Sequence, residues 1–223
     1  MRPVGVLVFP GSNCEHDVVR ALGDLGAPAE LVWHAQTDLS GYDGLVLPGG
    51  FAHGDYLRPG ALARFSPVMG AVAEAAAQGR PVLGICNGFQ ILTEAGLLPG
   101  ALRQNTGLTF ISRPVTVRVA SSQSVLTRTT AVGTRLVIPI NHFSGAYTCD
   151  DATYARLVEG GQVVLTYEDN PNGSRGDIAG IASAAGNVVG LMPHPERAMS
   201  SLLGSADGRG LLQSFVESTV LAR

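Results

Sequence analysis

The sequence lacks several features that would assign it to a specialised class of protein. Its three cysteines, Cys14, Cys86 and Cys149, are too few and too widely spaced for a disulfide framework or a Cys-x-x-Cys metal site. We therefore expect no metal in this chain and a reducing, cytoplasmic compartment. Charged residues make up 15% of the chain, the net charge is -3, and no basic run occurs. This balance argues against a nucleic-acid binder, because recognition of phosphates needs clustered basic side chains.

Long apolar runs are also missing. No stretch approaches the roughly 18 residues that a membrane-spanning helix needs. The apolar residues 4–10 lead directly into Gly11-Ser12-Asn13 without a small-residue cleavage site, so we expect neither a membrane span nor a signal peptide. What the sequence does contain is 45% hydrophobic residues in a chain of 223, with a mean hydropathy of +0.22. These values are typical of a compact globular protein with a substantial core.

Short apolar runs alternate with helix-like segments in the first half of the chain. The runs are rich in Val, Ile and Leu and cover residues 4–9, 29–34, 44–47 and 81–85. The segments between and after them that predict helices are residues 15–25, 61–78 and 87–95. Continuous apolar strands separated by helices are the pattern of a parallel sheet that is buried on both faces.

After Leu102 the pattern changes to strands separated by polar turns, at residues 115–120, 135–140, 162–167, 177–183 and 188–192. The turn signal Asn170-Pro171-Asn172-Gly173-Ser174 favours antiparallel pairing of the strands on either side of it. Residues 150–159 and 208–221 predict two further helices. Nothing resembles an interdomain linker, so we expect a single α/β domain over residues 1–223. Its open, mostly parallel sheet is flanked by helices and carries antiparallel additions.

Gly84-Ile85-Cys86-Asn87-Gly88 lies between a predicted strand and a predicted helix. This is the sequence form of a nucleophile elbow, in which flanking glycines permit a strained turn that presents the central side chain. The N-terminus of the helix would favour the thiolate form of Cys86, and the backbone N–H of Asn87 would face a developing oxyanion. The alternative is a buried structural cysteine in a strand-to-helix turn.

His194 is the candidate base, because Met192-Pro193-His194-Pro195-Glu196 follows an apolar strand. Pro195 favours an extended conformation at His194, and in an extended chain residues two apart face the same way. Glu196 is therefore predicted to orient the imidazole, as the third member of a catalytic triad does. The alternative is a proline-rich turn with an exposed ion pair.

Pro48-Gly49-Gly50-Phe51 ends another apolar strand. Successive glycines there let backbone N–H groups converge on an anion, so Gly50 or Phe51 is predicted to supply a second oxyanion donor beside Asn87. An ordinary turn is the alternative. The glycine pair does not belong to a phosphate loop, since no Gly-x-x-x-x-Gly-Lys-Ser/Thr occurs in the chain.

Together, these three motifs resemble the class I, or triad, glutamine amidotransferases, and they occur in that family's order over nearly the whole chain. The resemblance implies a flavodoxin-like fold and a triad of Cys86, His194 and Glu196. It also implies that the thiol attacks the side-chain amide of glutamine, that the imidazole transfers the protons, and that water resolves a glutamyl thioester. Gln90 matches the family position that helps to hold the substrate glutamine. An ordinary helix residue is the alternative for Gln90.

Within that family the chain is most similar to the glutaminase subunits of the phosphoribosylformylglycinamidine synthase branch, which belongs to purine biosynthesis. The similarity lies outside the bare triad, in Phe9-Pro10-Gly11-Ser12-Asn13-Cys14, Gly54-Asp55-Tyr56-Leu57-Arg58, Pro171-Asn172-Gly173-Ser174 and the residues 190–197 around the triad histidine. Segments that surround the triad in this way distinguish one amidotransferase from another.

The chain departs from that branch in two places. Pro139-Ile140-Asn141-His142-Phe143-Ser144-Gly145 stands where Pro-Ile-x-His-Gly-Glu-Gly is usual, and Ala52-His53 replaces a Ser-Tyr pair. Neither change touches the triad, so we expect them to alter partner contacts or signalling between active sites. His142 is either functional by position or a satisfied surface histidine, and Cys14 is expected to be a small residue packed in the first loop.

No ATP-binding signature is present in the chain, so we expect no cofactor here. The resemblance implies a separate synthetase subunit that binds ATP, magnesium and formylglycinamide ribonucleotide and receives ammonia through a channel, often with a small bridging subunit. A glutaminase serving another synthetase is one alternative. A cysteine peptidase or chaperone of the same superfamily would usually carry His where Asn87 stands. A non-catalytic flavodoxin-like binding subunit would have no reason to keep Cys86, His194 and Glu196 together.

Overall fold

The computed structural model describes residues 2–222 and contains a nine-stranded sheet whose first half is parallel. The parallel strands are β1 (Val4–Val8), β2 (Ala29–Trp33), β3 (Gly44–Leu47), β4 (Val82–Ile85) and β11 (Val188–Leu191). They lie in the order β2-β1-β3-β4-β11. Every residue of β3, β4 and β11 is buried, as expected for strands that helices cover on both faces.

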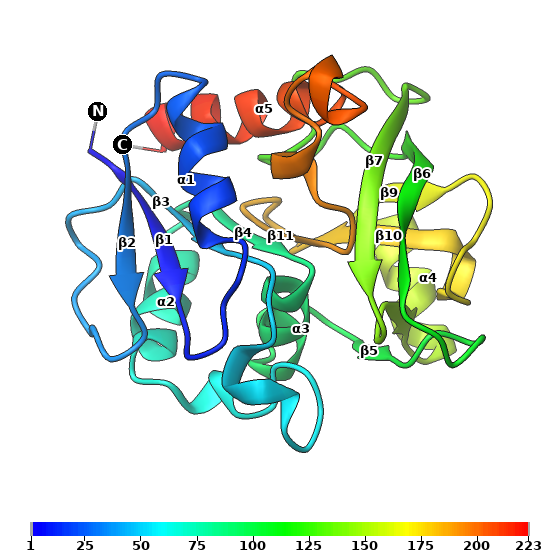
Figure 1. The fold of residues 1–223 in the computed structure, drawn as a ribbon, viewed down its shortest axis with the longest axis horizontal. Coiled ribbons are helices and arrows are strands. Elements are labelled where there is room, and N and C mark those ends of the chain that lie inside the picture. The colour runs from blue at the N-terminus through cyan, green and yellow to red at the C-terminus, as the bar shows by residue number, and fades with distance from the viewer. Residues whose placement is uncertain (1, 223) are drawn as a thin grey trace.

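The second half of the sheet is antiparallel and continues from β11. It comprises β10 (Ile178–Ala182), β9 (Val163–Tyr167), β6 (Ile111–Val119) and β7 (Arg135–His142), in that spatial order. Strands β9 and β10 pair on either side of the turn at residues 170–174, which confirms the predicted antiparallel pairing. Figure 1 shows β6 and β7 at one end of the molecule and β1 and β2 at the other.

Within residues 2–222, five α-helices complete the α/β arrangement, which confirms the predicted fold class. They are α1 (Glu15–Gly23), α2 (Val68–Ala77), α3 (Asn87–Glu94), α4 (Asp151–Glu159) and α5 (Gly208–Leu221). Helix α3 packs on β3, β4 and β11, so it lies over the centre of the sheet. From Arg2 to Ala222, none of the helices has the length and apolarity that crossing a bilayer requires.

The structure corrects the sequence prediction in two places. The helix predicted over residues 61–78 is broken into a 3-10 turn, Ala63–Phe65, and α2, because Pro67 forces Ser66 into an extended conformation with ψ 141°. The short strands β5 (Ala101–Arg103) and β8 (Ala146–Thr148), which were not predicted, form a separate two-stranded sheet. Three residues are too few to show a strand's alternation in a sequence.

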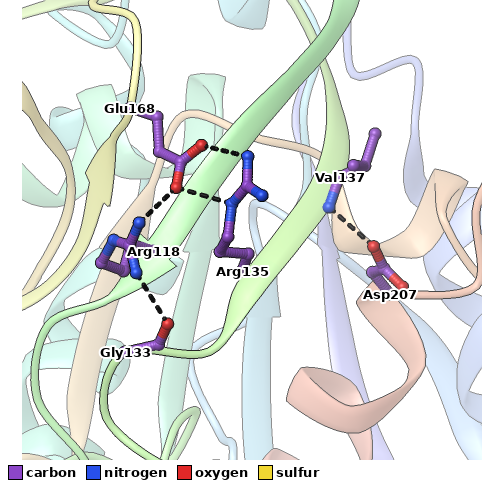
Figure 2. Close-up of polar contacts among 6 residues, drawn as sticks. All are labelled: Arg118, Gly133, Arg135, Val137, Glu168 and Asp207. Atoms are coloured by element: carbon purple, nitrogen blue, oxygen red, sulfur yellow. Dashed lines mark hydrogen bonds and ion pairs between the residues drawn. The ribbon is translucent and has the colours of Figure 1, made fainter.

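The outer strand β7 is tied to its surroundings by polar contacts (Figure 2). The N–H of Val137 donates to the Asp207 carboxylate at 2.7 Å, which occupies a hydrogen-bonding group at this edge of the sheet. Glu168, just after β9, accepts hydrogen bonds from Arg118 of β6 and from Arg135, the first residue of β7. Contacts of this kind protect an edge strand from pairing with another chain.

Candidate active site

Cys86 and His194 are brought together because the strands that precede them are neighbours in the sheet. Strands β4 and β11 run parallel, with Ile85 opposite Leu191. The N–H of Cys86 donates to the carbonyl of Leu191 at 2.8 Å, just beyond the last paired residues. Both segments therefore leave the sheet at the carboxyl ends of parallel strands, where ligands bind in folds of this kind.

Cys86 has the backbone conformation of a nucleophile elbow. Its φ of 51° and ψ of -103° lie in a region that residues with a side chain rarely adopt. The glycines on either side make the turn possible: a Cβ on Gly88 would lie 2.0 Å from the carbonyl oxygen of Leu47, and one on Gly84 would lie 2.7 Å from the backbone of Gly88. The Cys86 thiol lies 3.6 Å from the carbonyl oxygen of Asn141 and lines a cavity.

His194 and Glu196 form a buried pair, with 2.6 Å between Nδ1 of the imidazole and Oε1 of the carboxylate. The predicted contact is formed, but by a different route. Pro195–Arg197 is a 3-10 turn, not an extended segment, and this turn folds Glu196 back onto the ring. Burial by itself lowers the pKa of His194, yet the Glu196 carboxylate and the neighbouring thiols together raise it well above its ordinary value. The site therefore favours an imidazolium beside the Cys86 sulfur.

A second thiol also contacts the His194 ring. Cys14, in the loop after β1, interacts with the imidazole just as Cys86 does, while Nε2 of the ring has no well-aligned hydrogen-bond partner. The Arg197 guanidinium donates to the Cys14 sulfur at 3.1 Å and to Asp17 at 3.2 Å. Cys14 is thus buried beside the candidate base, and in addition to packing in the first loop its thiol interacts with the imidazole. Sequence reasoning missed this, because no local motif links the loop after β1 to the loop after β11.

Cys14, His194 and Glu196 each place one potential metal-binding atom within 4.8 Å of the others, the one such group within residues 2–222. The short hydrogen bond between His194 and Glu196 instead matches a base and the carboxylate that orients it. The geometry fits proton transfer at the Cys86 sulfur.

The predicted oxyanion donors divide into two groups. The N–H of Phe51 donates to the carbonyl of Gly11 at 2.8 Å, so this predicted donor already has an acceptor in the structure. Gly50 lines the cavity. Asn87 opens α3, where the first N–H groups of a helix have no intrahelical acceptor. Gly50 and Asn87 remain the candidates.

Side chains of α3 connect the nucleophile to the cavity wall. The Asn87 amide accepts from the N–H of Ala52 at 3.0 Å and donates to Gln90 at 2.9 Å. Gln90 in turn donates to the carbonyl oxygen of Ser144 at 2.6 Å and lines the cavity. Gln90 therefore lies in the wall of the cavity that Cys86 lines.

The segment that departs from the expected pattern forms one wall of the same cavity. Asn141, His142 and Ser144 all line it. His142 is 3% exposed and bonded to Asn105 at 3.1 Å, so its interpretation as a surface histidine is wrong. Burial, together with the charge of His194, lowers the pKa of His142 to about 4.

Comparisons with known proteins agree with this geometry. A family model described as the CobB/CobQ-like glutamine amidotransferase domain matches residues 2–210. The chain is 57% identical over 213 residues to a protein named phosphoribosylformylglycinamidine synthase subunit PurQ from Rubrobacter xylanophilus, covering 96% of this chain and 97% of that one. It also matches a chain in the structure of PurLQS from Thermotoga maritima, with a TM-score of 0.90 and 42% identity, covering 97% of this chain and 99% of that chain.

A more distant relative shares the fold alone. A glutamine amidotransferase from Thermotoga maritima superposes with a TM-score of 0.64 at 20% identity, with 99% of each chain covered.

Proposed function

The chain belongs to the CobB/CobQ-like glutamine amidotransferase family, and we propose that it is the glutaminase subunit of a phosphoribosylformylglycinamidine synthase. The extent of its identity to the Rubrobacter protein of that name, and its match to a chain of PurLQS, support this assignment. In this role the chain hydrolyses glutamine to glutamate and ammonia and passes the ammonia to a synthetase subunit.

In the first half of the reaction, the Cys86 thiolate attacks the amide carbon of the glutamine side chain. The carbonyl oxygen becomes an oxyanion, which the N–H groups of Gly50 and Asn87 stabilise; a donor of this type contributes about 3 kcal/mol in well-studied hydrolases. The His194 imidazolium gives its proton to the departing nitrogen. Ammonia leaves and a glutamyl thioester remains on the sulfur.

In the second half, His194 is neutral and acts as a base on a water molecule. The water attacks the thioester carbon, the same oxyanion donors stabilise the intermediate, and the carbon–sulfur bond breaks. Glutamate leaves, and the proton taken from water restores the imidazolium beside the Cys86 thiolate. Glu196 keeps Nδ1 protonated throughout, so that Nε2 faces the reacting atoms.

The single observation that carries the proposal is the buried His194–Glu196 pair, which lies where β11 ends next to the strand that delivers Cys86. An imidazole held by a carboxylate and facing a thiol on a strained elbow is the arrangement of a cysteine nucleophile with its base. Gln90, which lines the same cavity, is proposed to contact the substrate.

The proposal places ATP and magnesium on the synthetase partner, where formylglycinamide ribonucleotide is converted to formylglycinamidine ribonucleotide. A small third subunit is proposed to bridge the two. We place the complex in the cytoplasm, where the three free cysteines, Cys14, Cys86 and Cys149, stay reduced.

The test is Cys86→Ala in the assembled complex. Glutamine-dependent synthesis should fall by at least roughly 1,000-fold, whereas synthesis from added ammonium should survive, because the variant removes only the ammonia source. Cys149→Ala is the matched control and should keep both activities. If the Cys86→Ala complex still uses glutamine, the assigned nucleophile is wrong. If neither nitrogen source supports formation of formylglycinamidine ribonucleotide by the wild-type complex, the chain serves another synthetase.

A further inference from the structure

The cavity in front of Cys86 has an uneven distribution of charge. Its volume is about 750 Å³, and the charged side chains that line it include three arginines, Arg58, Arg103 and Arg175. Within the part of the chain that the structure describes, Asp55 is the one carboxylate in the lining. Free glutamine is a zwitterion, so a site that selects it must meet an ammonium as well as a carboxylate. Among the described residues that line the cavity, Asp55 is the anionic side chain available for the ammonium.

Two of the three arginines already have partners. Arg58 makes a bidentate pair with Glu94, at 2.6 and 2.7 Å. Arg175 donates to Asp151 and, at 3.0 Å, to the carbonyl oxygen of Cys149. Asp55, by contrast, forms no ion pair with any residue from 2 to 222, so its negative charge is available to a ligand.

A single side chain, that of Asn87, connects Asp55 to the segment that carries the nucleophile. The amide of Asn87, the residue after Cys86, donates to the Asp55 carboxylate at 3.4 Å. In extended glutamine, three carbon–carbon bonds separate the amide carbon from the α-carbon, which puts the α-nitrogen about 5 Å from the amide carbon. A substrate whose amide carbon meets the Cys86 sulfur therefore carries its ammonium about 5 Å away, within the cavity that both Cys86 and Asp55 line.

The loop that carries Asp55 is held in a strained conformation. His53, Asp55 and Leu57 all have positive φ, at 54°, 55° and 69°. Two hydrogen bonds hold the loop in place. The N–H of Ala52 donates to the side-chain oxygen of Asn87 at 3.0 Å, and the N–H of His53 donates to the carbonyl of Pro10 at 2.6 Å. Backbone strain of this kind persists where the surrounding structure enforces it, and it concentrates at functional sites.

The Asp55 carboxylate is also only partly hydrated. Burial raises its pKa to about 6, and the hydrogen bond from Asn87 offsets part of that shift. A half-buried carboxylate without a cationic partner is one that a bound ammonium would stabilise.

We propose that the Asp55 carboxylate binds the α-ammonium of glutamine and so selects the free amino acid over other primary amides. This inference rests on the proposed glutaminase function and deepens it. Asp55 acts in binding, and the chemistry stays with Cys86 and His194. Removing the carboxylate should therefore weaken substrate binding and leave the chemical steps in place.

The test compares glutamine with 4-carbamoylbutanoate, which keeps the amide and the carboxylate but lacks the α-amino group. Glutaminase kcat/KM is measured for both amides in the assembled complex. We expect the wild type to prefer glutamine by about 10- to 100-fold or more, the range of a charge-assisted hydrogen bond. Asp55→Asn should lose most of that preference through a higher KM for glutamine, with kcat kept within about threefold. Asparagine tolerates positive φ, so the loop conformation should survive.

Asp24→Asn, at the exposed end of α1, is the matched control and should keep the wild-type preference. If Asp55→Asn does not assemble, Asp55→Ser replaces it with the same expectation. A wild-type enzyme that uses both amides equally overturns the inference, and so does a neutral variant at this position that still prefers glutamine as the wild type does. Failure of the glutaminase assignment looks different: the wild-type complex would then release ammonia from neither amide.

Discussion

The parallel and antiparallel halves of the sheet contribute different parts of the candidate site. The groups proposed to react follow parallel strands: Gly50 follows β3, Cys86 follows β4 and His194 follows β11. The antiparallel half and the small second sheet supply part of the wall of the cavity, including Asn141 and Ser144 beside the nucleophile. Parallel strands end at one edge and so gather side chains there, whereas the added strands shape what can enter. Changes at the groups proposed to react should therefore act on rate, whereas changes in the cavity wall or in the packing around the elbow should act on binding or stability.

The largest effect within this comparison is expected at Glu196. Glu196→Gln keeps the size of the side chain but removes the charge that stabilises the His194 imidazolium and fixes its tautomer. We expect kcat for glutamine to fall roughly 100- to 10,000-fold, measured as ammonia release by the assembled complex. Glu217→Gln, on the exposed face of α5, is the control and should match the wild type. A loss below about threefold would mean that the pair does not act in catalysis.

Gly88 tests whether the elbow depends on close packing between α3 and β3. An alanine Cβ there would lie 2.0 Å from the carbonyl oxygen of Leu47, so Gly88→Ala should lower the free energy of unfolding by about 3 kcal/mol. Gly70→Ala is the matched control, since nothing lies within 4 Å of its Cβ and it sits in α2. It should raise the free energy of unfolding by up to about 1 kcal/mol. Urea unfolding measures both; equal stability of the two variants would contradict the close approach.

His142 tests the antiparallel half through the pH dependence of stability. Its folded-state pKa of about 4 lies below the ordinary value of 6.5, so below pH 6.5 the unfolded chain takes up a proton that the folded chain does not. Stability should therefore fall as pH drops from 6.5 towards 4, by about 2 kcal/mol between pH 7 and pH 5. His142→Gln should lack this part of the loss, while the exposed His16→Gln should keep it. The account is contradicted if His142→Gln and the wild type lose the same amount in urea unfolding at the two pH values.

The smallest effect is expected at the ion-pair network of Figure 2, far from the reacting groups. Arg118 and Arg135 are about half exposed or more, at 47% and 64%, so water and salt screen their attraction to Glu168. Glu168→Gln should lower Tm by no more than about 3 °C, and the difference should shrink as salt is added. A larger, salt-independent shift would assign this network to the core of the antiparallel half.

The residues proposed to react can be picked out from the sequence, because each lies in a local motif at the end of an apolar strand. Cys86 with its flanking glycines, and His194 with Glu196, are readable in that way. The hydrogen bond from the N–H of Phe51 to the carbonyl of Gly11 cannot be read from the sequence, because it depends on how the loops after β1 and β3 pack together. The position of Cys14 beside His194 cannot be predicted for the same reason, because it depends on how the loops after β1 and β11 pack together.

The fold shows the same division between local and long-range signals. Buried parallel strands appear as continuous apolar runs, so the strand predicted at residues 44–47 coincides with β3. The break before α2 is visible in principle, since Pro67 stands inside the segment 61–78 predicted as one helix. Strands β5 and β8 are defined only by their pairing with each other, which no local pattern encodes.

The most direct test asks which of two thiols reacts, because the thiols of Cys86 and Cys14 both raise the pKa of His194. The assembled complex is treated with an electrophilic glutamine analogue, and the modified peptide is identified by mass spectrometry. The account predicts that one adduct forms, on Cys86, and that excess glutamine prevents it. An adduct on Cys14, or labelling of both cysteines that glutamine does not slow, would contradict the assignment of the nucleophile.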